Sequence, residues 1–75
     1  MYIKSSNPEN RVRINLNHGT DYAPGIDRWD INEFCIIFKR NGNPIERWVY
    51  SNREQRDRDI DRIDTLLKTN FLIDF

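Results

Sequence analysis

The chain has 75 residues, with 12 Lys and Arg against 12 Asp and Glu, and 37% of its residues are hydrophobic. A chain of this length forms one domain, residues 1–75, and buries only about 60% of the surface that its unfolded state exposes. The zero net charge lacks the basic excess that is usual in nucleic-acid-binding domains. No segment approaches the roughly 20 apolar residues of a membrane span, so we expect a soluble, cytoplasmic protein without membrane association.

Small domains often need a disulfide, a metal or a partner to stabilise them. The single cysteine, Cys35, excludes an internal disulfide, and one cysteine with one histidine cannot supply a four-ligand zinc site without carboxylates. Cys35 lies in the most apolar run of the chain, where a free thiol behaves as a small hydrophobic group. We therefore expect a protein partner or self-association, with a homodimer as one form, and no metal or cofactor.

Residues 11–17 (RVRINLN) alternate apolar and polar side chains. This period of two is typical of a half-buried strand with one polar face. Tyr2 and Ile3 form a short apolar patch that can pair with this strand as a hairpin.

Residues 18–32 follow no periodic pattern and contain two glycines, one proline and three aspartates. This composition predicts an irregular loop, and so long a loop in a small domain is usually functional or poorly ordered. Tyr22 and Trp29 lie within it. A large aromatic side chain either pins a loop to the core or presents it to a partner, and we favour pinning for Trp29.

Residues 33–40 (EFCIIFKR) predict a strand, since the run from Phe34 to Phe38 is continuously apolar and rich in β-branched and aromatic residues. Such a run is typical of a central strand that is covered on both faces. Asn41-Gly42 follows it and is the strongest short-range signal for a β-hairpin turn.

The returning strand, residues 45–51, follows Pro44, which lacks an N–H and therefore fits only the start of a strand. One face of this strand is aliphatic apart from an arginine, and the other is mainly aromatic: Ile45, Arg47 and Val49 alternate with Glu46, Trp48 and Tyr50. If the aromatic face receives a helix, Trp48 and Tyr50 are core residues, which is the alternative we favour. If that face is exposed, it forms a platform that can stack single-stranded bases. The basic members of the platform would be Arg11, Arg13, Arg40 and Arg47.

Residues 51–69 predict one amphipathic helix that begins with a capping box at Ser51 and Glu54 and ends near Thr69-Asn70. Its apolar stripe has helical spacing and consists of Ile60, Ile63, Leu66 and Leu67. We interpret the charged residues opposite the stripe as a solvated face. They are Arg56, Asp57, Arg58, Asp59, Asp61, Arg62 and Asp64.

The last five residues, FLIDF, are apolar at four positions, which is unusual because chain ends normally fray. We expect them to pack as a last strand or as a hydrophobic tail, within the protomer or against another chain. Phe71 and Phe75 are therefore candidate contact residues.

Two polar groupings resemble sites but fail on their spacing. Counted from Asp57, the glycine and the bidentate acid of a calcium loop would fall on Arg62 and Lys68, which excludes that motif. His18 and Asp21 could act as a base and its orienting acid, but no nucleophile elbow, phosphate loop or metal spacing accompanies them. We interpret His18 as capping its own turn and predict that the protein is not an enzyme.

The stretch from Trp48 to Leu67 (WVYSNREQRDRDIDRIDTLL) resembles a strand-to-helix junction of small phage and mobile-element proteins. In that junction a strand ends in an aromatic-Ser pair and an acidic-basic helix follows. The resemblance implies a phage-encoded modulator of a host system, such as an anti-defence inhibitor of the anti-CRISPR class. It points to no single family and assigns no functional residues.

Together these observations predict an α+β fold, with a small antiparallel sheet of three or four strands and one C-terminal amphipathic helix packed on one face. The expected core consists of Val12, Ile14, Leu16, Phe34, Ile36, Phe38, Ile60, Ile63 and Leu67, joined by Trp48 or Val49 according to register. We expect a small non-enzymatic protein-binding module, and the alternative is a single-stranded nucleic-acid binder that uses Trp48 and Tyr50. The candidate binding residues are Tyr22, Trp29, Arg47, Trp48, Tyr50, Phe71 and Phe75.

Overall fold

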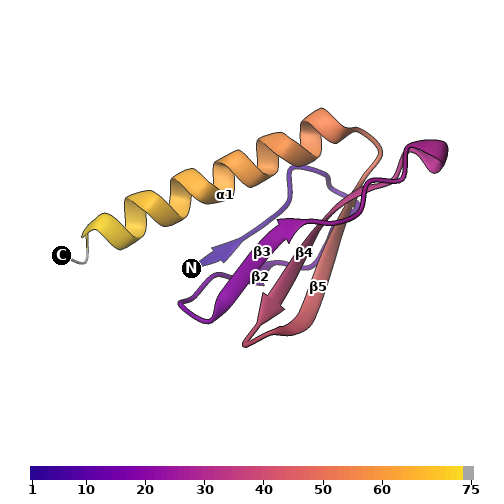
Figure 1. Cartoon of the computed structure of the whole chain (residues 1–75). Helices are drawn as coiled ribbons and strands as arrows, with labels where there is room; N and C mark the ends of the chain where they lie inside the picture. The colour runs from indigo at the N-terminus through magenta and orange to yellow at the C-terminus, as the bar shows by residue number, and fades with distance from the viewer. Residues whose placement is uncertain (74–75) are drawn as a thin grey trace.

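The computed structural model describes residues 1–73, with side chains described as far as residue 68. It has the predicted α+β fold, in which a three-stranded and a two-stranded antiparallel sheet accompany one long helix (Figure 1). The two-stranded sheet has the order β1-β2 and the three-stranded sheet the order β3-β4-β5. The elements are β1 Tyr2–Ile3, β2 Ile14–Asn15, β3 Thr20–Pro24, the 3₁₀ helix η1 Trp29–Ile31, β4 Phe34–Arg40, β5 Asn43–Tyr50 and α1 Arg53–Ile73.

The predicted N-terminal hairpin is confirmed, because Ile3 of β1 pairs with Ile14 of β2. The strand is shorter than predicted, however, and the expectation that Val12 belongs to the core is wrong, since its side chain is 54% exposed. Before β2 the chain runs beside β5, where the Trp48 indole Nε1–H donates to the Val12 carbonyl at 3.0 Å. Pairing with β1 covers only Ile14 and Asn15.

The prediction of an irregular loop over residues 18–32 is wrong, because Thr20–Pro24 forms β3 and pairs with β4. Thr20 lies opposite Arg40 and Pro24 opposite Ile36. The proline is compatible with this strand because β3 is the outermost strand of its sheet, where a missing N–H breaks no ladder bond.

The β4–β5 hairpin forms as predicted around Asn41 and Gly42. Both residues have positive φ, 53° and 83°, as a type I′ turn requires. The returning strand begins at Asn43, one residue before Pro44, and the register shifts between Phe38 and Lys39.

The aromatic face of β5 is the buried one. Trp48 lies opposite Ile36 and Tyr50 opposite Phe34, and both aromatic side chains are only 1% exposed. Their face packs against α1 and the N-terminal sheet, and the Trp48 ring meets Phe38 edge-on with centroids 4.7 Å apart. The buried core consists of Ile3, Ile14, Leu16, Phe34, Ile36, Phe38, Trp48, Tyr50 and Ile63, with Tyr22, Ile60, Leu66 and Leu67 packed against it.

The opposite face of the sheet is less covered than the continuous apolar run of β4 predicts. Ile37 is half-buried and Ile45 is exposed on this face, whereas Cys35 is buried. Gly25 explains the burial of Cys35, since a Cβ at Gly25 would lie 2.3 Å from the Cys35 Sγ. The absence of a side chain at Gly25 therefore lets the chain close over the thiol.

The helix begins one residue later than the predicted capping box. Asn52 is its N-cap, because its Oδ1 accepts the N–H groups of Glu54 at 2.8 Å and Gln55 at 3.2 Å. The helix continues to Ile73, so the prediction that it ends near residue 70 is wrong and the backbone at Phe71 is helical rather than a strand. Phe75 lies outside the described residues.

The prediction that the charged side of the helix is a solvated face is wrong at two positions. Arg56 and Asp59 are each only 2% exposed. The Asp59 carboxylate joins three segments of the chain: its Oδ2 accepts hydrogen bonds from the Tyr50 hydroxyl, the Ser5 hydroxyl at 3.2 Å and the Ser6 N–H at 2.9 Å. A buried carboxylate needs such donors, since its burial without them is costly.

Acid is expected to destabilise the protein through Asp59. Burial opposes ionisation, but the hydrogen bonds from Tyr50 and Ser6 and the charge of Arg62 outweigh it, so the pKa of Asp59 lies below its ordinary value. A carboxyl with a lowered pKa in the folded state stabilises it above its unfolded pKa of about 3.9. This stabilisation is lost as the pH falls through the folded pKa.

The variant Asp59→Asn is expected to be about 1–2 kcal/mol less stable at pH 7 and to lose part of this acid dependence. The measurement is urea unfolding at a series of pH values from 7 to below 3. Asp61→Asn is the matched control, because Asp61 is an exposed aspartate on the same helix. An Asp59→Asn profile as steep in acid as that of the unmodified protein would contradict the assignment.

Candidate functional site

The connection between β3 and β4, residues 25–33, is an ordered projection, which we call the tip. Figure 1 shows it extending beyond the rest of the protein at the end where α1 begins. Two backbone hydrogen bonds close it, from the Arg28 N–H to the Glu33 carbonyl at 2.8 Å and from the Glu33 N–H to the Arg28 carbonyl at 2.9 Å. Between them lie η1 and Asn32, whose left-handed backbone (φ 49°) ends the 3₁₀ turn. The tip is thus an extension of the β3–β4 hairpin with a defined conformation.

Three large apolar side chains of the tip are exposed to solvent. The exposed fractions are 89% for Ile26, 61% for Trp29 and 52% for Ile31. Scattered exposed apolar residues are normal on a protein surface, but three within six residues of one projecting segment form a local group.

A buried arginine holds the base of the tip against α1. Arg56 donates from Nη1 to one oxygen of Asp27 at 2.8 Å and from Nη2 to the other at 3.2 Å. The same Nη1 donates to the Cys35 carbonyl at 3.1 Å, which connects the tip, the central strand and the helix. The hydrogen bonds from Arg56 hold the pKa of Asp27 below its usual range, against a smaller opposing effect of burial.

Trp29 is fixed from two sides although most of its surface is exposed. Its ring meets Phe34 edge-on with centroids 4.8 Å apart, and the Arg53 guanidinium lies 5.5 Å from its centroid. The first contact is a favourable aromatic geometry and the second a cation–π interaction. Trp29 contacts the core residue Phe34, as the pinning prediction expects. Most of its indole is nevertheless exposed, which that prediction does not account for.

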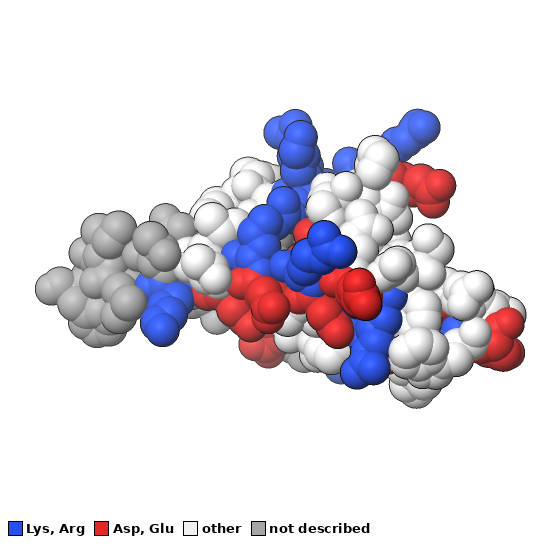
Figure 2. All heavy atoms as spheres, turned by 90° about the horizontal axis from the view of Figure 1, so that it is seen from above, with Lys and Arg blue, Asp and Glu red and all other residues white. Residues whose placement is uncertain are grey.

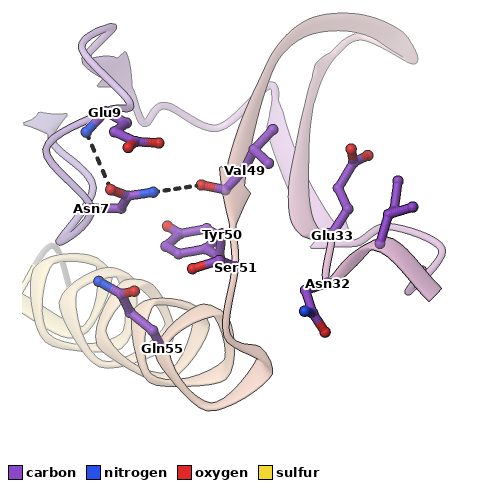
Figure 3. Close-up of a pocket in the computed structure, with 9 residues that line it drawn as sticks. Asn7, Glu9, Asn32, Glu33, Val49, Tyr50, Ser51 and Gln55 are labelled. Carbon is purple, nitrogen blue, oxygen red and sulfur yellow. Dashed lines mark hydrogen bonds between the residues drawn. The ribbon is translucent and has the colours of Figure 1, made fainter. Parts of the chain in front are cut away.

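Two open hollows border the tip. One, of about 280 Å³, lies between Asn32 and Glu33 of the tip, the end of β5 and the N-terminal segment, as Figure 3 shows. Ile31 also lines it. Its wall is rigid at Asn7, because Asn7 Nδ2 donates to the Val49 carbonyl at 2.8 Å and Asn7 Oδ1 accepts the Glu9 N–H at 3.2 Å. A second hollow, of about 260 Å³, is lined by Trp29, Asn32, Phe34 and residues 51–54. Trp29 and Ile31 therefore each border a depression.

The structure disperses the predicted binding residues. Trp48 and Tyr50 lie in the core, so the aromatic platform for single-stranded bases has no exposed rings here, because the helix covers that face. Tyr22 is half-buried in β3, with its ring 6.4 Å from that of Phe38 and its hydroxyl bonded to Asp64. Arg47 is exposed and forms an ion pair with Glu33 at 3.6 Å. The side chain of Phe71 and the whole of Phe75 lie outside the described part of the chain.

The residues of the candidate acid–base pair, His18 and Asp21, lie at or just before the start of β3. His18 and Asp21 are both exposed, and the turn beside them is capped by Asn17, whose Oδ1 accepts the Gly19 N–H at 2.9 Å. Asn17 therefore caps this turn, and the role predicted for His18 stays a prediction. Within residues 1–73, no group of three or more His, Cys, Asp or Glu side chains could hold a metal ion.

Charges on the helix side of the molecule alternate in sign. Figure 2 views this side from above and shows Lys and Arg side chains interleaved with Asp and Glu side chains. Nucleic-acid backbones need a clustered cationic surface, which this arrangement does not provide. Among the described residues, no helix combines the length and apolar composition required to cross a membrane. The charged helix residues with partial or full exposure are Arg53, Glu54, Asp57, Arg58, Asp61, Arg62, Asp64 and Lys68.

Sequence reasoning identified Trp29 as a candidate binding residue but missed Ile26, Ile31 and the Asp27–Arg56 contact. Ile26 and Ile31 stand on either side of Trp29 in GIDRWDIN, and this local enrichment in apolar residues was a usable signal. Asp27 and Arg56 are 29 residues apart, and nothing in the local sequence pairs them. Comparison with protein-family models, curated proteins and solved structures finds no match to this chain, so the site is defined by its geometry alone.

Proposed function

We propose that the protein is a non-enzymatic protein-binding module that holds its partner through the tip. The observation that carries the proposal is the exposed indole of Trp29 on a loop that Arg56 anchors to the core. Tryptophan is enriched among the residues that dominate interface energies. A loop already fixed in one conformation loses little entropy when it binds.

The two hollows support a partner that surrounds the tip rather than one that only touches its apex. Ile31 borders one hollow and Trp29 the other, so side chains of a partner can pack on both. The charges near the tip are of both signs, with Arg28 and Arg53 near Asp30 and Glu33. This mixture favours a protein surface over a polyanion. The narrower expectation of a phage-encoded inhibitor of a host complex stays a prediction, and the proposal does not depend on it.

The test is affinity capture from a lysate of the native host, with and without nuclease, using immobilised protein and its variants. The double variant Trp29→Ala, Ile31→Ser is expected to abolish capture of the partner both with and without nuclease. Loss of the tryptophan alone is expected to weaken binding roughly tenfold or more, as for a hot-spot residue. Trp29→Ala is expected to lower the free energy of unfolding by only about 1 kcal/mol, because it removes one aromatic and one cation–π contact.

Val12→Ser is the matched control, because Val12 is an exposed apolar residue outside the tip. It is expected to leave capture unchanged. Equal capture by the tip variant and by the control would contradict the proposal, and capture lost only after nuclease treatment would assign the binding to nucleic acid instead. Light scattering of the purified protein tests separately whether the partner is a second copy.

A further inference from the structure

The two outer edges of the three-stranded sheet differ. On β5 the outer edge is occupied by side chains: Asn10 Oδ1 accepts the Val49 N–H at 2.9 Å, and Asn10 Nδ2 donates to the Val49 carbonyl at 2.9 Å. The Arg47 N–H donates to the Glu46 carboxylate at 2.8 Å. On β3 no strand of the described chain pairs with the outer edge. Such an edge is a template for another strand unless it is blocked.

The register shows which backbone groups of β3 point outward. The Gly25 N–H donates to the Cys35 carbonyl at 2.9 Å, and the Asn41 N–H donates to the Gly19 carbonyl at 3.1 Å. Odd-numbered positions therefore face β4, and in an antiparallel ladder the even-numbered positions between them face away. The outward positions are Thr20, Tyr22 and Pro24.

These three positions present one donor and three acceptors. Pro24 has no N–H, and the Thr20 N–H already donates to the Asn17 carbonyl at 3.0 Å. What remains is the N–H of Tyr22 and the carbonyls of all three residues. Within the described chain none of these four groups has a hydrogen-bond partner.

This pattern disfavours a second copy of β3. If two copies paired antiparallel about Tyr22, the two tyrosine backbones would exchange two hydrogen bonds. Each Pro24 carbonyl would then face a Thr20 whose N–H is occupied, and each Thr20 carbonyl would face a proline. A different strand with three free N–H groups at alternate positions can form four bonds, two with Tyr22 and one with each flanking carbonyl.

We propose that the outer edge of β3 binds an extended segment of a protein partner by strand addition, independently of the tip. An open depression of about 360 Å³ beside this edge is lined by Ala23, Pro24 and Ile37, together with Asp21, Tyr22 and Lys39. A residue of the added strand opposite Ala23 would cover apolar surface, and the residue opposite Asp21 would lie beside a carboxylate. The segment that fits therefore has, from its N-terminus to its C-terminus, an apolar residue opposite Ala23, any residue opposite Tyr22 and a basic residue opposite Asp21.

Helix α1 touches β3 at Tyr22 and continues beyond this contact. Tyr22 contacts Asp64 through its hydroxyl, and α1 continues nine residues further, to Ile73. At 1.5 Å per residue this is about 13 Å of helix, which Figure 1 shows projecting past the sheet.

The probe is the capped pentapeptide acetyl-Thr-Val-Thr-Arg-Thr-amide, titrated into the full chain and followed by the backbone amide resonances. Binding is expected to shift the signals of Tyr22 and Ala23. The same peptide N-methylated at its first, third and fifth residues lacks the required donors and is expected to bind roughly tenfold or more weakly. Replacing its arginine by glutamate is expected to weaken binding because of Asp21.

Two protein variants complete the test. Tyr22→Pro removes the outward donor at an edge position where proline is tolerated, and is expected to weaken peptide binding. Trp29 lies in the tip, so Trp29→Ala is expected to leave peptide binding at the β3 edge unchanged. The two variants therefore distinguish a failure of the edge proposal from a failure of the tip proposal. Equal binding of the peptide and its N-methylated form, or no shift at Tyr22 at millimolar peptide, would overturn the proposal. A dimer that Tyr22→Pro dissociates would also overturn it.

Discussion

Replacing Trp48 by alanine is expected to lower the free energy of unfolding by about 3–5 kcal/mol, the cost of truncating a large buried aromatic side chain. The side chain is 1% exposed, packs edge-on against Phe38 and donates its indole N–H to the Val12 carbonyl. Its truncation leaves a cavity in the core and removes the hydrogen bond to the Val12 carbonyl. A chain of this size has a total stability of roughly 4–11 kcal/mol, so the variant approaches or passes the threshold for folding.

The two tryptophans provide the control within one molecule. Trp29→Ala is expected to lower the free energy of unfolding by only about 1 kcal/mol, and urea unfolding of the two variants measures the difference directly. Trp48→Phe gives a milder truncation if the alanine variant does not fold. Fluorescence quenching also distinguishes the two tryptophans. An aqueous quencher should reduce the fluorescence of the exposed Trp29 but not that of the buried Trp48. Similar losses of stability for both alanine variants would mean that the aromatic face of β5 does not meet the helix.

The β4–β5 hairpin and the two faces of β5 could be predicted from the sequence. Alternation in β5 separated an aromatic face from an aliphatic one, and the Asn41-Gly42 turn fixed the hairpin, because both are local properties of the chain. The preference for Trp48 and Tyr50 as core residues is confirmed by their burial. Sequence could not settle it fully, because which face a sheet buries depends on the register of packing against a helix more distant in the chain.

The parts that sequence missed depend on contacts between distant residues. β3 has a proline, two polar residues and no alternation of its own, so only its pairing with β4 makes it a strand. Charge alone placed Arg56 and Asp59 on a solvated face, yet each satisfies its burial through partners on other elements. A charged side chain on a helix can be buried when a residue distant in the sequence provides an opposite charge or a hydrogen-bond donor.

Arg56→Met is expected to lower the free energy of unfolding by about 1.5–3 kcal/mol, the range for hydrogen bonds to charged groups. Methionine keeps the apolar length of the arginine side chain but cannot donate to Asp27 or to the Cys35 carbonyl. Arg58→Met is the matched control on the same helix, because Arg58 is exposed and surface substitutions of this kind usually change stability by less than about 0.5 kcal/mol. Urea unfolding of both variants measures the difference.

A double-mutant cycle separates the Arg56–Asp27 interaction from the general effect of losing a buried arginine. Asp27→Asn should cost less in the Arg56→Met background than in the unmodified protein, since its partner is already gone. Equal costs in the two backgrounds would show that the pair is not coupled. Arg56→Lys is expected to rescue little, because an ammonium group cannot make the two-pronged contact with both Asp27 oxygens.

The same cycle links stability to the proposed function through the tip. If Arg56 fixes the tip, its loss should accelerate amide hydrogen exchange at Arg28 and Glu33, whose mutual hydrogen bonds close the projection. Trp29 would remain exposed in the variant but would no longer be held in one orientation. Affinity for the partner should therefore fall even where Trp29 itself is intact, because the loop must be ordered at the moment of binding. Asp59→Asn, which disturbs a different buried carboxylate, should destabilise the protein without this specific effect on the tip.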